Sequence, residues 1–146
     1  MSYTRNYLHI VFGTKYRIRA ISPDKKERLY KYMAKTIHNK KCELININGI
    51  ENHIHLLINL HPSVSLADLV KSIKVASSRL ITETHYLPLF EGWATEYYAC
   101  SVSPSHLKFI NEYIDCQEVH HKEKGYEDEM NRFVKKMGMD LYRDEE

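Results

Sequence analysis

The sequence predicts an α+β fold, and three observations carry this prediction. Segments with the alternation or the β-branched and aromatic content of strands occupy residues 7–13, 42–50, 53–60 and 96–102. Segments with the periodicity of amphipathic helices occupy residues 22–40, 65–84 and 103–122. Short turn signals separate these segments, and the first six follow the split β-α-β order. We therefore expect a ferredoxin-like or RRM-like antiparallel sheet with helices on one face, followed by a C-terminal helix.

The first half of the chain carries clear boundary signals. Residues 7–13 have strand composition, and Ser22 with Pro23 predicts a helix that begins there and continues to about residue 40. The segments 42–50 and 53–60 alternate as strands should. The short turn between them at Glu51 and Asn52 predicts a β-hairpin.

The second half adds two helices and a strand. Ser65 and Asp68 resemble a capping box at the start of the helix over 65–84. A loop with Pro88 and Gly92 leads to the strand over 96–102, and Ser103–Pro104 repeats the earlier helix start. We expect one domain over 1–146: a core over 1–102, a helix over 103–124, and a short acidic helix with a tail over 125–146.

Composition limits the class of protein. The chain has 146 residues, 43% hydrophobic and 27% charged, as in an ordinary globular protein, and no apolar run reaches bilayer length. No signal-peptide layout begins the sequence, and three widely spaced cysteines predict no disulfide framework, so we expect a cytoplasmic protein. Net charge is +2, but residues 1–41 hold eleven Lys or Arg against two acidic residues. That excess suits either a polyanion partner or a solvated helix face.

Two histidines stand within the strand "HIHLLINL". Residues two apart in a strand point to the same side, so His53 and His55 face together while Ile54 points the opposite way. Leu56 and Ile58 share the side of Ile54, which we expect to be the core. Two imidazoles on the open face can chelate a metal, or they can be structural histidines with other hydrogen-bond partners.

The helix over 103–124 carries a second polar pattern. Helical spacing places several polar side chains along one stripe, which runs through His106, Tyr113, Gln117, His120 and Lys124. A tyrosine with a glutamine one turn later could be held out for chemistry. An amphipathic helix with a half-buried tyrosine would give the same pattern, so the helix alone leaves the choice open.

Together these segments resemble a known family. A His-hydrophobe-His strand followed much later by "YIDCQ" is similar to the single-tyrosine, TnpA-type transposases of the HUH superfamily, which mobilise insertion sequences as single-stranded DNA. "HIVFGTKYR", "ENHIHLLINL", "LVKSIKVASSRLI" and "INEYIDCQEVHHK" carry the resemblance across nearly the whole chain. It implies that Tyr113 is the nucleophile, and that His53, His55 and Gln117 hold a divalent metal, Mg²⁺ or Mn²⁺.

The resemblance also implies a reaction and partners. The tyrosine would attack a DNA phosphate, form a 5′-phosphotyrosine intermediate at a hairpin-marked element end, and allow rejoining by the reverse step. Homodimers with active sites shared between the two chains are implied as well. One departure is "CSVSPS" before the tyrosine helix, where several relatives have glycines that let this helix swing between partners.

DNA contacts and alternative functions complete the prediction. Phosphate contacts are expected from polar residues of the helix over 65–84 and from one arginine after the first strand, namely Lys71, Lys74, Ser78, Arg79 and Arg17.

A domesticated relative acting on repeated palindromes would share these residues. A replication initiator or relaxase of the same superfamily is a further alternative. A non-catalytic single-stranded nucleic-acid-binding module would leave Gln117 and the histidine pair unexplained.

Overall fold

A four-stranded antiparallel sheet forms the centre of the molecule. The computed structural model describes residues 2–117 and 125–136. The strands are β1 (Tyr7–Gly13), β2 (Glu43–Ile50), β3 (His53–Asn59) and β4 (Tyr98–Val102), and they lie in the order β2-β3-β1-β4. Every neighbouring pair is antiparallel. The predicted α+β, ferredoxin-like sheet is therefore confirmed.

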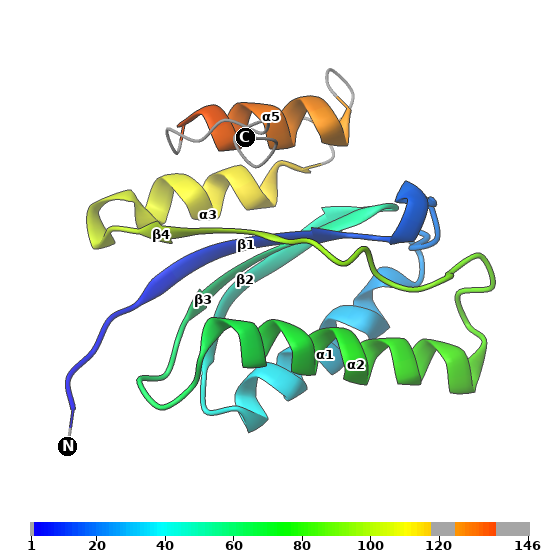
Figure 1. Cartoon of the computed structure of the whole chain (residues 1–146), viewed down its shortest axis with the longest axis horizontal. Helices are drawn as coiled ribbons and strands as arrows, with labels where there is room; N and C mark the ends of the chain where they lie inside the picture. The colour runs from blue at the N-terminus through cyan, green and yellow to red at the C-terminus, as the bar shows by residue number, and fades with distance from the viewer. Residues whose placement is uncertain (1, 118–124, 137–146) are drawn as a thin grey trace, which may run out of the picture.

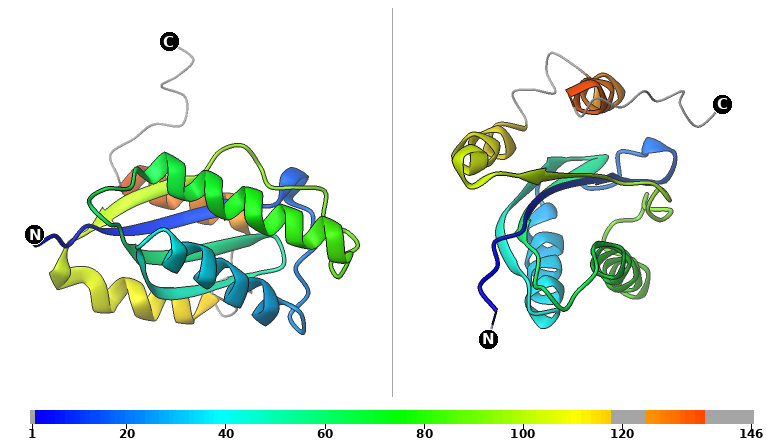
Figure 2. Two further views of the ribbon diagram at one scale, coloured as in Figure 1. Left: turned by 90° about the horizontal axis from the view of Figure 1, so that it is seen from below. Right: turned by 60° about the vertical axis from the view of Figure 1, so that its left-hand side comes forward.

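Helices lie on both faces of this sheet. The helices α1 (Lys26–Asn39) and α2 (Leu66–Thr84) lie together on one face, and α3 (Leu107–Asp115) and α5 (Tyr126–Lys136) lie on the other (Figures 1 and 2). Two short 3-10 turns, η1 (Lys15–Arg17) and η2 (Pro104–His106), follow β1 and precede α3. Among the described residues, no helix is long and apolar enough to cross a bilayer.

The hydrophobic core lies between the sheet and the pair α1 and α2. As the strand alternation predicts, Ile54, Leu56 and Ile58 of β3 are fully buried on this side. They pack in one cluster with apolar side chains of both helices, including Met33 and Ile73. The opposite side of β3 thus carries His53 and His55, and it is the candidate functional face.

Two helix starts differ in how well local signals locate them. The helix α1 begins at Lys26, about one turn later than Ser22 and Pro23 predict, because the Ser22 carbonyl accepts from the amides of Lys25 and Lys26 in a preceding turn. The start of α2 is as predicted: the Ser65 side chain accepts from the Asp68 amide at 3.1 Å.

Gly49 allows the hairpin that carries the histidines to close tightly. It pairs with Ile54 across β2 and β3. A Cβ atom at position 49 would clash with the backbone carbonyl oxygen of His53. The absence of a side chain at Gly49 therefore helps to set the position of His53.

Candidate metal and nucleophile site

The two histidines of β3 are buried, and each is oriented by a hydrogen bond at its Nδ1 atom. His53 and His55 are both 0% exposed. The Nδ1 atom of His53 lies 2.9 Å from Oδ1 of Asn52, and that of His55 lies 2.8 Å from Nε2 of His9. With Nδ1 engaged, each ring presents its Nε2 atom for another partner, as metal-binding histidines commonly do.

His9 is a third histidine of the site, and no pattern in the sequence marks it as one. It lies on β1 and points to the same face as Val11, which pairs with His55. Its ring stacks on that of His55, with centroids 5.1 Å apart. Burial, helped by the neighbouring His55, lowers the pKa of His9 to about 3, against the opposing effect of Glu129. His9 is therefore neutral at neutral pH and can hold one tautomer of His55.

Tyr113 reaches the histidines from α3 of the same chain. Its ring centroid lies 6.0 Å from that of His55 and 6.4 Å from that of His9. It packs with Val11 and Tyr98 in a small apolar cluster on this face. Burial raises the pKa of the Tyr113 phenol, and the hydrogen bond and negative charge of Glu129 raise it further, opposed by Arg132. The phenol is therefore protonated at neutral pH.

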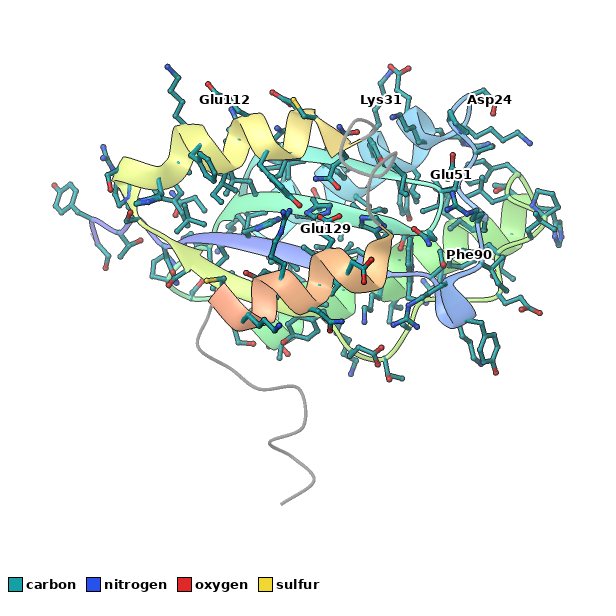
Figure 3. All side chains as sticks on the ribbon, turned by 90° about the horizontal axis from the view of Figure 1, so that it is seen from above. Asp24, Lys31, Glu51, Phe90, Glu112 and Glu129 are labelled. Carbon is teal, nitrogen blue, oxygen red and sulfur yellow. The ribbon has the colours of Figure 1, made fainter. Side chains whose placement is uncertain are left out.

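Glu129 completes the cluster from α5. Its carboxylate is almost fully buried, and its Oε1 atom accepts from the Tyr113 hydroxyl at 2.7 Å and lies 3.0 Å from Nε2 of His55. The other carboxylate oxygen lies 3.9 Å from Nε2 of His53. Figure 3 shows Glu129 in the space between α5 and α3. The ligand atoms of His53, His55 and Glu129 all lie within 4.8 Å of one another, a spacing that a metal ion could bridge.

Gln117 lies one turn after Tyr113 and is fully buried. Its Nε2 atom donates to the Tyr113 carbonyl at 3.3 Å. Its Oε1 atom is also buried, and it has no hydrogen-bond partner among the described residues. A buried amide oxygen without a partner is costly unless another group supplies one, so this atom suits a ligand that the protein itself does not provide.

The predicted DNA contacts on α2 lie on the other side of the sheet from this cluster (Figure 1). Among them, Lys71, Ser78 and Arg79 line a cavity of about 740 Å³ beside α2. Arg17 is exposed in η1.

Lys74 lines the same cavity but is engaged within the protein. Its ammonium group donates to the carbonyls of Ala94, Thr95 and Glu96 at 2.7, 3.3 and 3.4 Å. Burial lowers its pKa, with Glu96 acting in the opposite direction. In this structure Lys74 therefore fastens the segment before β4 to α2.

Three other residues belong to the predicted polar stripe, namely His106, His120 and Lys124. His106 is exposed in η2, where its Nδ1 atom lies 3.2 Å from the Ser103 hydroxyl. His120 and Lys124 lie outside the described residues, as do residues 137–146 of the predicted tail.

Comparisons with known proteins match most of the chain. The family described as "Transposase IS200 like" matches residues 2–117. Transposases for insertion sequence element IS200 from Salmonella typhimurium and Salmonella typhi are each 28% identical over 114 residues, which cover 75% of this chain and 74% of each relative. The ISDra2 transposase TnpA of Deinococcus radiodurans is 27% identical over 120 residues, covering 79% of this chain and 84% of that protein.

Two solved structures share the architecture. A crystal structure described as a transposase of Deinococcus radiodurans R1 superposes with a TM-score of 0.62 at 25% identity, covering 80% of this chain and 95% of the other. A REP-associated tyrosine transposase bound to a REP hairpin superposes with a TM-score of 0.63 at 14% identity, covering 83% and 72%. At that identity the second likeness shows the fold alone.

Proposed function

The chain belongs to the IS200-like transposase family, and from this premise we propose that it cleaves and rejoins single-stranded DNA at hairpin-marked element ends through a 5′-phosphotyrosine intermediate. The observation that carries the proposal is the contact of Tyr113 with Glu129, which in turn lies against His55. A nucleophile, a hydrogen-bond acceptor and imidazoles thereby meet at one buried point, as covalent catalysis requires.

In the proposed cleavage step, Tyr113 is the nucleophile and Glu129 accepts its proton. The Tyr113 oxygen attacks the scissile phosphorus, a new O–P bond forms, and the bond from phosphorus to the 3′-oxygen breaks. Glu129 is placed to accept the phenol proton, because its Oε1 atom lies 2.7 Å from the hydroxyl. The 3′-oxygen leaves and gains a proton. Attack by a 3′-hydroxyl on the phosphotyrosine reverses the step, so no external energy source is needed.

The donor set fits a divalent cation. His53, His55 and Gln117 would hold the ion through two imidazole nitrogens and the amide oxygen that lacks a protein partner, with Glu129 as a further ligand. When bound, Mg²⁺ or Mn²⁺ would polarise the scissile phosphate and stabilise its developing charge. His9 would act through His55, because it fixes the orientation of that ring.

Single-stranded DNA with hairpins is the proposed partner. A solved structure with the same fold is described as bound to a REP hairpin, which supports this partner. Lys71, Ser78, Arg79 and Arg17 remain the proposed phosphate contacts, and Lys74 a weaker candidate because it is engaged with backbone carbonyls. We also propose a homodimer, on the strength of the family resemblance.

A covalent-trapping assay tests the proposal. The protein is mixed with Mn²⁺ and labelled single-stranded DNA from the flanks of its own gene, and denaturing gels are examined for a protein–DNA adduct. We expect an adduct from the wild type, none from Tyr113→Phe or His55→Ala, and an unchanged amount from Tyr98→Phe. Tyr98 is the matched control because it is a buried tyrosine on the same face.

Two results would contradict the proposal. An adduct that survives Tyr113→Phe would assign the nucleophile to another tyrosine. DNA binding without any adduct, at all metal concentrations, would instead support a non-catalytic binding module.

A further inference from the structure

The turn η1 displays an aromatic side chain on unfavourable backbone. Tyr16 and Arg17 both have left-handed backbone, with φ of 59° and 55°. This conformation is unfavourable for residues with a Cβ atom, and glycine or asparagine would adopt it more readily. The Tyr16 side chain is 75% exposed, so its ring adds little to the stability of the fold. Packing therefore does not account for an aromatic residue at this position.

Hydrogen bonds hold this turn from two sides. The Thr14 amide donates to the Asn52 carbonyl at 3.0 Å, and the Lys15 amide donates to the Gly92 carbonyl at 2.8 Å. Within the turn, the Thr14 hydroxyl donates to the Ile18 carbonyl at 2.7 Å. A turn that is already ordered loses little conformational freedom when it binds a partner. The turn η1 therefore has the rigidity that favours recognition.

The surroundings of Tyr16 suit a nucleic acid. Lys15 and Arg17 are exposed on either side of it in the sequence, and the Lys15 ammonium group lies 5.2 Å from the centre of the ring. These three residues line a cavity of about 260 Å³, whose lining also includes Trp93 and one acidic residue, Glu96. Proteins that bind single strands combine basic groups for the phosphates with aromatic rings on which bases stack. An open ring between two basic side chains has this composition.

The turn also lies next to the candidate site, at the end of β1 that is far from the N-terminus (Figure 1). Gly13, the last residue of β1, pairs with His53. Asn52, whose carbonyl accepts from Thr14, also has its Oδ1 atom 2.9 Å from Nδ1 of His53. Tyr16 follows Gly13 by three residues, so their Cα atoms are at most about 11 Å apart, or about three nucleotide steps of a DNA strand. A strand that enters the candidate site can therefore reach Tyr16.

We infer that the Tyr16 ring is a stacking platform for one unpaired base of the single-stranded DNA close to the scissile phosphate, and that Lys15 and Arg17 contact the adjacent phosphates. This inference rests on the proposed function, and it adds a residue that binds the substrate without taking part in the reaction. Every base has a face that can stack, so Tyr16 strengthens the binding of a strand without selecting its sequence.

DNA binding without metal tests the platform. The full chain, in EDTA, is titrated into the labelled single-stranded DNA of the trapping assay, and fluorescence anisotropy is measured. We expect Tyr16→Leu to weaken binding by about 5- to 150-fold, the usual effect of losing one stacked base, and Tyr16→Phe to retain most of the affinity. Tyr3→Leu is the matched control, because Tyr3 is 91% exposed and precedes the other end of β1. Unchanged binding by Tyr16→Leu, or an equal loss in Tyr16→Phe, would overturn the inference.

The salt dependence of binding separates stacking from charge. Tyr16→Leu should leave the slope of log affinity against log salt concentration unchanged, because stacking involves no phosphate. Lys15→Gln should reduce the magnitude of that slope by about 0.7, the value for one phosphate contact on a single strand. A slope that falls in Tyr16→Leu as well would show that the loss comes from a displaced turn, and the stacking role would be refuted.

The position of the stacked base distinguishes this inference from the proposed function. A 2-aminopurine base, whose fluorescence is quenched by stacking, is placed at successive positions of the DNA, and Tyr113→Phe protein is used so that no cleavage occurs. We expect quenching within about three nucleotides of the cleavage site that the trapping assay maps, and its loss when Tyr16→Leu is added. Quenching that depends on Tyr16 without any wild-type adduct would refute the proposed function and leave the platform. An adduct without such quenching would refute the platform alone.

Discussion

The two faces of the sheet are equally buried along the middle of β3, but they differ in chemistry. Ile54 and His55 are adjacent in β3, and both are 0% exposed. Ile54 packs into the apolar layer under α1 and α2, whereas His55 touches His9 and Glu129. Burying apolar surface stabilises the fold, but burying polar groups is costly unless they bond to each other. One face thus provides stability, and the other holds the polar groups of the candidate site in place.

The helices on the two faces differ in the same way. On the apolar face, α2 has 19 residues, a cap from Ser65 at its start and a left-handed residue, His85, at its end. On the polar face, α3 has nine residues and is held by side chains of β2. The position of α2 follows from its own sequence and its apolar stripe, whereas the position of α3 depends on contacts with a strand that is distant in the sequence.

The largest expected effect comes from the apolar face. Phe12 is fully buried, and its ring meets that of Trp93 edge to face with centroids 5.0 Å apart. Phe12→Ala should lower the free energy of unfolding by about 3–5 kcal/mol, because it leaves a cavity in the apolar layer. Urea unfolding measures this, with Phe12→Leu as the milder control, expected to lose less than about 1.5 kcal/mol. A loss below that control would contradict a stabilising role for this face.

The contrast between the faces also explains what the sequence could reveal. The alternation of β3 predicts both sets of side chains, since Ile54, Leu56 and Ile58 enter the core and the histidine pair faces the other way. His9 could not be predicted as part of the site because a single histidine within an apolar strand has no informative spacing. Its side-chain contact with His55 arises only when β1 and β3 lie side by side.

Glu129 and two asparagines of β2 that contact α3, Asn46 and Asn48, could not be predicted for a related reason. Glu129 is the last of three consecutive acidic residues, a pattern typical of a solvated helix. It is buried because α5 packs across the sheet, with Met130 joining the cluster of Val11 and Tyr98. Asn46 and Asn48 look like ordinary solvent-facing positions of an alternating strand until α3 covers them. Local patterns located the strands and the helix that carries Tyr113, but not the contacts between distant elements.

A double-mutant cycle on His9 and His55 tests whether the polar face is stabilised by its internal bonds. His9→Leu and His55→Leu should each lower the free energy of unfolding by about 1–3 kcal/mol, because each leaves a buried nitrogen without its partner. The double variant should lose less than the sum, with a coupling of about 0.5–3 kcal/mol. Denaturant unfolding in EDTA measures this without a contribution from bound metal. Strict additivity would show that the two rings do not support each other.

Alkaline pH tests the same face through Tyr98. Burial raises the pKa of its phenol above the ordinary value, and Cys100 adds to the shift. Above about pH 10 the unfolded chain releases this proton while the folded chain keeps it, so stability falls as pH rises, by at most about 1.4 kcal/mol per pH unit. Tyr98→Phe should remove this part of the loss, as shown by unfolding curves at pH 9 and pH 10.5. Identical pH dependence in both proteins would contradict the shift.

The smallest effect is expected at the start of α2, where the helix is fixed by its own cap. Ser65→Ala removes the acceptor of the Asp68 amide and should lower the free energy of unfolding by about 1 kcal/mol. Ser65→Asp restores an acceptor and should recover most of that loss. Neither variant should move the ¹⁹F resonance of 3-fluorotyrosine at position 113, because Ser65 belongs to a helix on the opposite face from α3. A shift of that resonance would show that the two faces are coupled through the sheet, and that the placement of Tyr113 depends on the apolar side as well.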